Sequence, residues 1–358
     1  MKKVILMAAF FAAILSCGSK PTPDPDPEPP ASFIVKTPDF AKGADISSIT
    51  EMEKKGYKFY SSDGKEKECT ALMKELGCNS VRYRVWVNPT DGWCNKADVL
   101  VKAKRAQELG MAIMIDFHYS DWWADPGKQK IPAGWPTTVD GLVQKVEEHT
   151  REVLQLLYDN KISVNWVQIG NETNTGMLWP TGEVTNANHG LNFVKMVNAG
   201  YNAVKAIYPD AQVIVHHSNA QDLGANTWFY GMIVAAGAKF DMIGLSLYPS
   251  YWTDGKYPDW KPYCQSSVVN IMTLANTYDK PVMLVEFGMP ASEPAKSKEA
   301  LKYILDAIVG SHMDSGLPEE TWCKGVFYWE PESEHDRNNY DYGCFAGGKS
   351  TGVLDLFK

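Results

Sequence analysis

Two glutamates stand at the ends of apolar, strand-like runs of this 358-residue chain. Glu172 closes the run that begins at Trp166, and Glu286 closes a second run of the same design that begins at Val282. A strand that ends in a carboxylic acid delivers that acid to the rim of a sheet. Glycoside hydrolysis needs two such groups, because one protonates the leaving oxygen while the other attacks the sugar or activates water. The pair therefore predicts a glycosidase.

Strand-like and helix-like segments alternate along the chain that must position these glutamates. Eight runs fit buried strands, at residues 43–46, 80–87, 112–117, 164–169, 212–216, 242–247, 281–287 and 325–329. Apolar residues at helical spacing lie between them, for example at residues 96–109, 142–158, 190–207 and 297–308. Apolar strands that alternate with helices predict an α/β fold, a (β/α)8 TIM barrel forming a single catalytic domain over residues 33–358.

Polar and aromatic residues fall at the C-terminal ends of the predicted strands, where this fold holds its catalytic groups. In chain order they are Asp45, Arg82, Arg84, Asp116, His118, Asn171, Glu172, His216, His217, Tyr248, Glu286, Trp329 and Glu330. Each of them singly is consistent with a hydrogen-bonded polar residue of the core. Their convergence on one rim predicts a functional site. Adjacent strand residues point to opposite faces, so only one of the two neighbouring histidines is expected to serve it.

Composition restricts the substrate. The formal net charge is −8 and no basic cluster is visible, which argues against a nucleic-acid partner, since phosphate backbones are bound by patches of Lys and Arg. A neutral substrate fits better. The chain holds 12 tryptophans, several of them among Gly and Pro in loop-like segments, where exposed indoles can stack on sugar rings, although a share of them is expected in the core.

The N-terminal segment resembles an export signal. Residues 1–17 combine Lys2 and Lys3 with an apolar run and end in an Ile-Leu-Ser-Cys sequence, which predicts a lipoprotein signal peptide with its lipobox at Cys17. An ordinary cleaved signal peptide is the alternative. Residues 18–32, rich in Pro and Asp, predict an extended linker. We expect an exported outer-membrane lipoprotein at the cell surface, attached to the membrane through lipidated Cys17.

The remaining cysteines have no zinc-binding pattern. They are Cys69, Cys78, Cys94, Cys264, Cys323 and Cys344. Without a C-x-x-C pair a zinc site is not expected, and in an exported protein one to three disulfides are permitted, with the pairing left open.

Two further motifs suggest ligands. Residues 343–350 match the Walker A pattern by letter, but a nucleotide site needs a strand before this motif and a helix after it, and residues 351–358 are too few for a helix of useful length and a later acidic strand. Asp336, Asn338, Asn339 and Asp341 are oxygen ligands suited to calcium, yet their spacing is not that of an EF-hand loop, so a solvated loop is favoured. No cofactor and no catalytic metal are expected.

An ordered set of motifs resembles a known family. The motifs are RYRVWVNP at 82–89, DFHYSD at 116–121, WADP at 123–126, PAGWP at 132–136, IGNE at 169–172, LWPTG at 178–182 and FYWEP at 327–331. Together they are similar to those of family 53 glycoside hydrolases, the arabinogalactan endo-β-1,4-galactanases. The resemblance covers nearly the whole chain from about Gly43 onward. Some bacterial members hold calcium near the last two βα loops, but residues 288–298 here lack the acidic ligands expected for it.

The resemblance implies a role for each catalytic carboxyl group. It makes Glu172 the acid/base and Glu286 the nucleophile of a retaining double displacement that cuts the β-1,4-galactan side chains of pectin. Asn171 is implied to bind the substrate 2-hydroxyl, and His216, rather than its neighbour, matches the histidine of the fifth strand. An environment that raises the pKa of Glu172 is expected, while Arg82 and Tyr248 are expected to favour the ionised form of Glu286.

The resemblance also assigns aromatic subsites. Trp329 matches the platform under the sugar at the cleavage point. The loop tryptophans offered for further subsites are Trp93, Trp123, Trp135, Trp179 and Trp252, with a core role as the alternative for each.

Two other functions are consistent with the same residues. The fold and the positions of the acid/base and nucleophile do not fix the sugar, so another retaining endo-β-1,4-glycanase of the same clan, a mannanase or a cellulase, is the first alternative. A non-catalytic, surface glycan-binding lipoprotein is the second. It would need the tryptophans but not both glutamates. The expected partner is galactan, and the expected state is a monomer.

Overall fold

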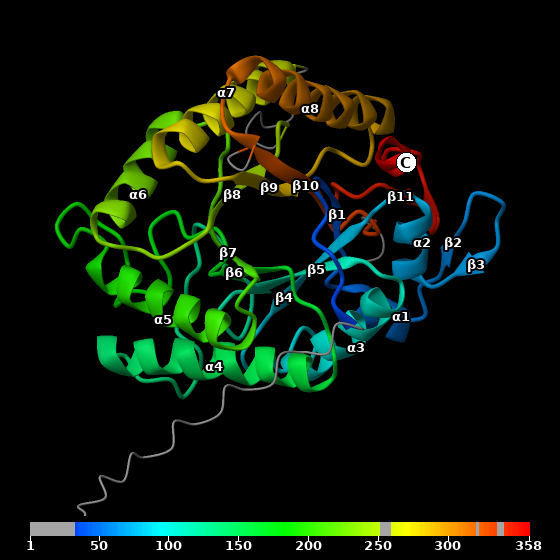
Figure 1. The fold of residues 1–358 in the computed structure, drawn as a ribbon. Helices are drawn as coiled ribbons and strands as arrows, with labels where there is room; N and C mark the ends of the chain where they lie inside the picture. The colour runs from blue at the N-terminus through cyan, green and yellow to red at the C-terminus, as the bar shows by residue number, and fades with distance from the viewer. Residues whose placement is uncertain (1–32, 251–258, 320–321, 335–339) are drawn as a thin grey trace, which may run out of the picture.

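Eight parallel strands close into a barrel in the computed structural model, which describes residues 33–250, 259–319, 322–334 and 340–358 (Figure 1). The strands are β1 (Ala41–Asp45), β4 (Ser80–Val85), β5 (Ala112–Phe117), β6 (Trp166–Ile169), β7 (Gln212–His217), β8 (Met242–Leu247), β9 (Val282–Phe287) and β10 (Cys323–Trp329). Each strand pairs in parallel with its two neighbours, and β1 joins β4 to β10 to complete the ring.

Helices surround the strands, as Figure 1 shows in a view in which α4 lies below the barrel and α7 and α8 above it. They are α1 (Ile49–Lys54), α2 (Cys69–Glu75), α3 (Lys96–Glu108), α4 (Val139–Asp159), α5 (Leu191–Ile207), α6 (Leu223–Ala235), α7 (Lys261–Tyr278) and α8 (Pro294–Ser315). Capping side chains mark the N-terminal ends of some of these helices. The side chain of Asn95, for example, accepts hydrogen bonds from the backbone N–H groups of Ala97 and Asp98 and caps α3.

The predicted TIM barrel is confirmed, and all eight predicted strands are barrel strands. The C-terminal boundaries differ most at the second of them, predicted at 80–87, which ends at Val85. The next two residues leave the sheet because their backbone N–H groups bond to loops instead: Trp86 donates to the carbonyl of Cys94, and Val87 to that of Ser120. The chain therefore begins its catalytic-face loop two residues earlier than the apolar pattern indicates.

The barrel interior is closed below the catalytic face by apolar side chains. The cluster consists of Ala41, Ala112, Met114, Trp166, Ile214, Met242, Met283, Val285 and Phe327. Trp166 and Phe327 meet edge to face across the barrel, with ring centroids 6.1 Å apart. Gly43 makes room for this contact, because a Cβ atom there would stand 2.2 Å from the Phe327 ring. The polar groups above this layer thus rest on a packed floor.

A small second sheet lies outside the barrel and was not predicted. It joins β2 (Phe59–Tyr60) and β3 (Glu66–Lys67) to β11 (Phe345–Ala346) and β12 (Lys349–Ser350). The glycines of the Walker-like segment form the turn between β11 and β12. The backbone N–H groups of Gly347 and Gly348 donate to the carboxylate of Glu334, at 2.7 and 2.8 Å. The segment is therefore a hairpin whose turn already binds an internal carboxylate.

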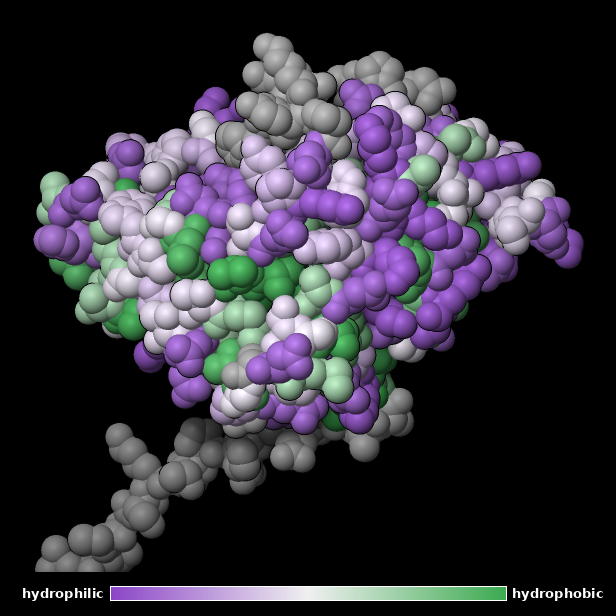
Figure 2. Space-filling view, turned by 90° about the horizontal axis from the view of Figure 1, so that it is seen from above, coloured by the Kyte–Doolittle hydropathy of each residue, from purple (hydrophilic) through white to green (hydrophobic). Residues whose placement is uncertain are grey.

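The outer surface on the side of α7 and α8 carries a mixture of polar and apolar side chains (Figure 2). Exposed apolar residues on these helices include Val269, Val309 and Met313. Across the described part of the chain, no helix is both long enough and apolar enough to cross a membrane.

The six cysteines from Cys69 to Cys344 are buried, and the structure joins none of these described residues to another in a disulfide. Several predictions fall outside the described residues. They concern residues 1–32, including Cys17, together with Trp252, Asp336, Asn338 and Asn339.

Candidate active site

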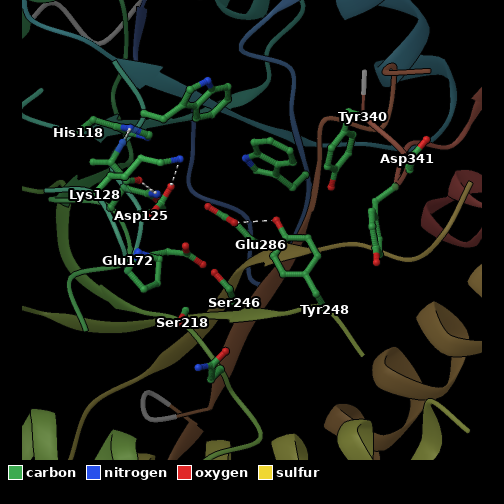
Figure 3. Close-up of a pocket in the computed structure, with 17 residues that line it drawn as sticks. His118, Asp125, Lys128, Glu172, Ser218, Ser246, Tyr248, Glu286, Tyr340 and Asp341 are labelled. Atoms are coloured by element: carbon green, nitrogen blue, oxygen red, sulfur yellow. Dashed lines mark hydrogen bonds and ion pairs between the residues drawn. The ribbon is translucent and has the colours of Figure 1, made fainter. Parts of the chain in front are cut away.

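A cleft of about 770 Å³ opens at the C-terminal ends of the barrel strands and contains both glutamates. Its lining comprises His118, Trp123, Ala124, Asp125, Pro126, Lys128, Asn171, Glu172, Ser218, Asn219, Ser246, Tyr248, Glu286, Trp329, Tyr340, Asp341 and Tyr342. Figure 3 shows the carboxyl groups of Glu172 and Glu286 facing one another in this cleft. A volume of this size accommodates a ligand larger than a single sugar.

Glu286 is fixed by strong hydrogen bonds at the end of strand β9. One carboxylate oxygen lies 3.0 Å from the Nη1 of Arg82, and the other accepts the hydroxyl proton of Tyr248 at 2.7 Å. The side chain is only 5% exposed. Both partners favour a negative charge on this carboxyl group and hold it in one orientation.

Arg82 is the hub of the buried polar layer beneath the cleft. Its guanidinium also lies 2.8 Å from the carboxylate of Asp45 and 2.9 Å from that of Asp116. Its Nη2 donates to the side-chain oxygen of Asn171 at 2.9 Å. Because Arg82 is almost completely buried, these contacts replace the water it lost on folding. Asp45 and Asp116 therefore support the site from below and do not line the cleft.

Glu172 is presented by a loop rather than by a strand. Strand β6 ends at Ile169, and the chain then turns through Gly170, with φ +82°, and through Glu172 itself, with φ +44°. A left-handed conformation is costly for a glutamate and persists only where its surroundings impose it. Here Gln129 supplies part of that constraint, since its side-chain N–H donates to the carbonyls of Asn171 at 2.8 Å and Glu172 at 3.4 Å.

The two carboxyl groups have different proton affinities. Burial, followed by the neighbouring Glu286, raises the pKa of Glu172 to about 8. Burial also raises the pKa of Glu286, to about 7, but Arg82 and the Tyr248 hydroxyl oppose that rise. We therefore assign to Glu172 the proton that the pair shares and to Glu286 the charge. This is the division that one acid and one nucleophile require.

The two neighbouring histidines of strand β7 have separate environments, as alternation along a strand predicts. His216 is fully buried beneath the cleft, where it contacts the side chains of Gln168 and Ser246. His217 points outward, with its ring centroid 5.1 Å from that of Phe229 on α6. Only His216 therefore reaches the site.

Aromatic side chains form the walls of the cleft. Trp123 and Trp329 contact each other, with ring centroids 5.7 Å apart, and Tyr340 packs edge to face on Trp329 at 4.6 Å. The guanidinium of Arg84 lies 4.1 Å from the ring centre of Trp123 and pairs with Glu330. Arg84 thus supports an aromatic wall, not a catalytic carboxyl group.

Three of the predicted loop tryptophans do not line the cleft: Trp93, Trp135 and Trp179. Trp135 packs against His149 of α4 and lines a separate pocket of about 360 Å³. The indole N–H of Trp179 donates to the carbonyl of Thr175 in its own loop. Trp135 and Trp179 thus make contacts within their own part of the fold instead of facing the cleft. Their sequence context does not reveal this.

Sequence analysis missed several groups of the site. Gln168 lies in the middle of the buried strand β6 and bridges Asp116 and Arg82, at 2.6 and 3.2 Å. Ser246 is likewise a polar residue within an apolar strand, one position before the end of β8. A polar residue in the middle of an apolar strand was the available signal for both. The cleft residues Tyr340 and Tyr342 gave no such signal, because their position depends on how the last loop folds.

Within the described ranges, no cluster of three or more His, Cys, Asp or Glu side chains is arranged to hold a metal ion. Of the proposed calcium ligands, only Asp341 is described. It lines the cleft, and its carbonyl accepts the backbone N–H of Ala291.

The comparisons with known proteins agree with this geometry. The model of glycosyl hydrolase family 53 matches residues 41–352. The chain is 32% identical to the arabinogalactan endo-β-1,4-galactanase of Thermothelomyces thermophilus, covering 83% of this chain and 91% of that protein. A solved structure from a study of two fungal β-1,4-galactanases is 29% identical, with a TM-score of 0.77 over 88% of this chain and 98% of the other.

A second solved structure that this chain resembles is the GH53 catalytic domain of Ignisphaera aggregans. It is 25% identical, with a TM-score of 0.77 over 91% of this chain and 98% of that one. The match of the family model over most of the chain, together with these relatives, shows that this chain belongs to glycosyl hydrolase family 53 and is a glycoside hydrolase.

Proposed function

We propose that this protein is an endo-β-1,4-galactanase that cleaves β-1,4-galactan with retention of configuration. One observation carries the proposal. Two glutamates face one cleft, and of the two it is Glu286 whose carboxylate is bound directly by an arginine and by a tyrosine hydroxyl. The names of the relatives supply the choice of sugar, because both the fungal protein and the fungal structure are described as galactanases.

In the first step of the proposed reaction, Glu286 acts as the nucleophile. Its carboxylate attacks the anomeric carbon and forms a covalent glycosyl ester, while Glu172 gives its proton to the departing glycosidic oxygen. The hydrogen bonds from Arg82 and Tyr248 hold Glu286 ionised and aimed at the cleft. The raised pKa of Glu172 keeps a proton available at neutral pH.

In the second step, the same two residues exchange tasks. Glu172, now a carboxylate, accepts a proton from water as the water oxygen attacks the anomeric carbon, and the bond from that carbon to the carboxylate oxygen of Glu286 breaks. The sugar is released with its original configuration, Glu286 regains its charge and Glu172 regains its proton. Asn171 and the aromatic walls at Trp123 and Trp329 would orient the sugar during both steps.

The cellular setting is proposed from the sequence alone. We propose that residues 1–17 direct export, that Cys17 carries a lipid anchor in the outer membrane, and that residues 18–32 separate the catalytic domain, residues 33–358, from the membrane. Such a surface enzyme would act as a monomer on the galactan side chains of pectin.

A polysaccharide panel tests the proposal. The parent protein and a Glu286→Ala variant are incubated with linear β-1,4-galactan, mannan and cellulose, and the released oligosaccharides are followed over time. Internal cleavage of galactan by the parent alone is the expected result. Cleavage of mannan or cellulose in place of galactan would refute the choice of sugar, and binding without cleavage would indicate a glycan-binding protein. Proton NMR of the first product reports its anomeric configuration, and an α product would refute retention.

A further inference from the structure

Beside the acid/base lies a serine that sequence analysis did not consider. Ser246, near the end of β8, is 1% exposed at its place in the cleft wall. The pairing of β8 with β9 shifts register between Leu245 and Ser246, so that Ser246 stands directly opposite Glu286. Such irregularities re-aim side chains next to active sites. In Figure 3 the Ser246 hydroxyl points toward the carboxyl group of Glu172.

The direction of the hydrogen bonds at Ser246 is set by His216. The imidazole Nδ1 accepts a hydrogen bond from the backbone N–H of Glu172 at 3.2 Å. A backbone N–H can only donate, so the direction of this hydrogen bond is fixed. The side-chain N–H of Gln168 points at the same nitrogen at 3.0 Å. Nδ1 therefore has no proton in the neutral ring, and the proton is on Nε2.

Other contacts agree with this tautomer. The amide of Gln168 cannot be turned around, because its nitrogen donates to Asp116 and its oxygen accepts from Arg82. The side-chain oxygen of Asn171 also lies 3.1 Å from Nδ1, but the backbone N–H of Glu172 already donates to that nitrogen, which therefore has no proton to give. Burial, followed by the charge of Arg82, lowers the pKa of His216 well below its ordinary value, so the ring is neutral.

The Nε2–H of His216 donates to the hydroxyl oxygen of Ser246 at 2.7 Å. The serine has a single hydroxyl proton, and His216 does not accept it, so this proton is available for the carboxyl group of Glu172, which the hydroxyl faces in the cleft. A donor favours the ionised form of a carboxyl group.

We propose that Ser246 is a positioning residue for the acid/base: His216 orients its hydroxyl, and the hydroxyl holds the carboxyl group of Glu172 toward the cleft. This inference rests on the proposed function, since it takes Glu172 as the acid/base. The same histidine binds the backbone N–H of Glu172, so His216 and Ser246 together hold both the main chain and the side chain of a residue in a left-handed conformation.

The pKa of Glu172 reflects several opposing effects. Burial and the charge of Glu286 raise it, and Asp125 adds to that rise, whereas Ser246 and Arg82 lower it. The ionisable groups that face Glu172 are Glu286 from β9, Arg82 from β4, Asp125 from the loop after β5, His216 from β7 and Tyr248 directly after β8. Among the groups that lower the pKa, Ser246 can be removed without adding or removing a charge.

The test is the pH dependence of kcat/KM on galactan for Ser246→Ala. Without the hydroxyl donor the pKa of Glu172 rises, and the basic limb of the profile moves upward by about one pH unit, the effect of losing one hydrogen bond to a charged group. The acidic limb, which reports Glu286, stays in place. Ser246→Thr, which keeps a hydroxyl, returns the basic limb toward that of the parent protein.

A matched control is Ser218→Ala. Ser218 lines the same cleft, but its hydroxyl accepts from Asn174 and does not bond to either glutamate, so the basic limb should not move. If Ser246→Ala does not fold, Ser246→Cys, whose thiol is a weak donor, must show the upward movement. A basic limb at the parent pH in the Ala or Cys variant overturns the inference, as does an equal movement in the Thr variant.

A separate variant distinguishes failure of this inference from failure of the proposed function. If Glu172→Ala cleaves galactan as fast as the parent, Glu172 is not the acid/base, and both proposals fail. If Glu172→Ala is inactive while Ser246→Ala keeps the parent profile, only the role of Ser246 is refuted.

Discussion

The two glutamates of the cleft are held by contrasting structures. Glu286 belongs to the regular strand β9 and is bound by an arginine and a tyrosine hydroxyl. Glu172 follows a strand, has a left-handed backbone, and is held through neutral groups on His216, Gln129 and Ser246. Burial raises the pKa of both carboxyl groups, but Arg82 and the Tyr248 hydroxyl oppose that rise at Glu286, which favours the charge on Glu286 and the proton on Glu172.

The largest expected effect concerns the strand-borne glutamate. Glu286→Ala should lower kcat on galactan by about 10⁴-fold or more, because without its carboxylate no glycosyl ester forms. Azide added with an activated aryl galactoside should enter the vacated space and give an α-galactosyl azide, which NMR identifies. A β-azide would instead assign Glu286 the role of acid/base.

Removing the loop-borne glutamate should have a smaller effect that depends on the substrate. Glu172→Ala should lose about 10²–10⁴-fold on galactan, the range that general acid catalysis supplies, and much less on a dinitrophenyl galactoside, whose leaving group needs no proton. Azide should here give the β-galactosyl azide. Steady-state rates on both substrates check the contrast, and equal losses on the two would contradict the assignment.

The hydroxyl group of Tyr248, which donates a hydrogen bond to Glu286, can be removed without other changes to the site. Tyr248→Phe should reduce kcat/KM at neutral pH by about 10-fold or more, as expected for losing a hydrogen bond to a charged group. Because the tyrosine lowers the pKa of Glu286, its loss should move the acidic limb of the pH profile to higher pH. A profile that moves only at its basic limb would mean that the tyrosine acts on Glu172.

The smallest expected effect is on stability. The pKa of Glu172 rises from 4.5 to about 8 on folding, so the folded protein binds more protons than the unfolded chain between these values, and stability falls as the pH rises through that window. Glu172→Gln removes this ionisation and should raise Tm by roughly 2–4 °C at pH 8. At pH 4.5 the gain should vanish. Scanning calorimetry at the two pH values measures it, and an equal gain at both would contradict the raised pKa.

The barrel and the meeting of Glu172 and Glu286 at its rim were predictable because both depend on local pattern. Apolar strands such as 112–117 and 242–247 were predicted with the boundaries that the structure has, and a glutamate that ends such a strand must reach the rim. The family motifs then distinguished the roles of Glu172 and Glu286.

What could not be predicted depends on contacts between distant segments. The sheet that joins β2 to β12 pairs residues nearly 300 positions apart, and its strands of two residues have no hydrophobic period. Trp123 and Trp135 have similar loop contexts, yet only Trp123 faces the cleft. The orientation of Ser246 follows from the tautomer of His216, which no sequence pattern encodes.

The central claim is that Glu286 forms the covalent bond while Glu172 carries the proton. Incubation with a dinitrophenyl 2-deoxy-2-fluoro-β-galactobioside should trap the glycosyl ester, since the fluorine slows its hydrolysis, and mass spectrometry of peptic peptides locates the label. The account predicts one fluorogalactobiosyl group on Glu286. A label on Glu172, or complete turnover of galactan with inverted configuration and no trapped ester, would contradict it.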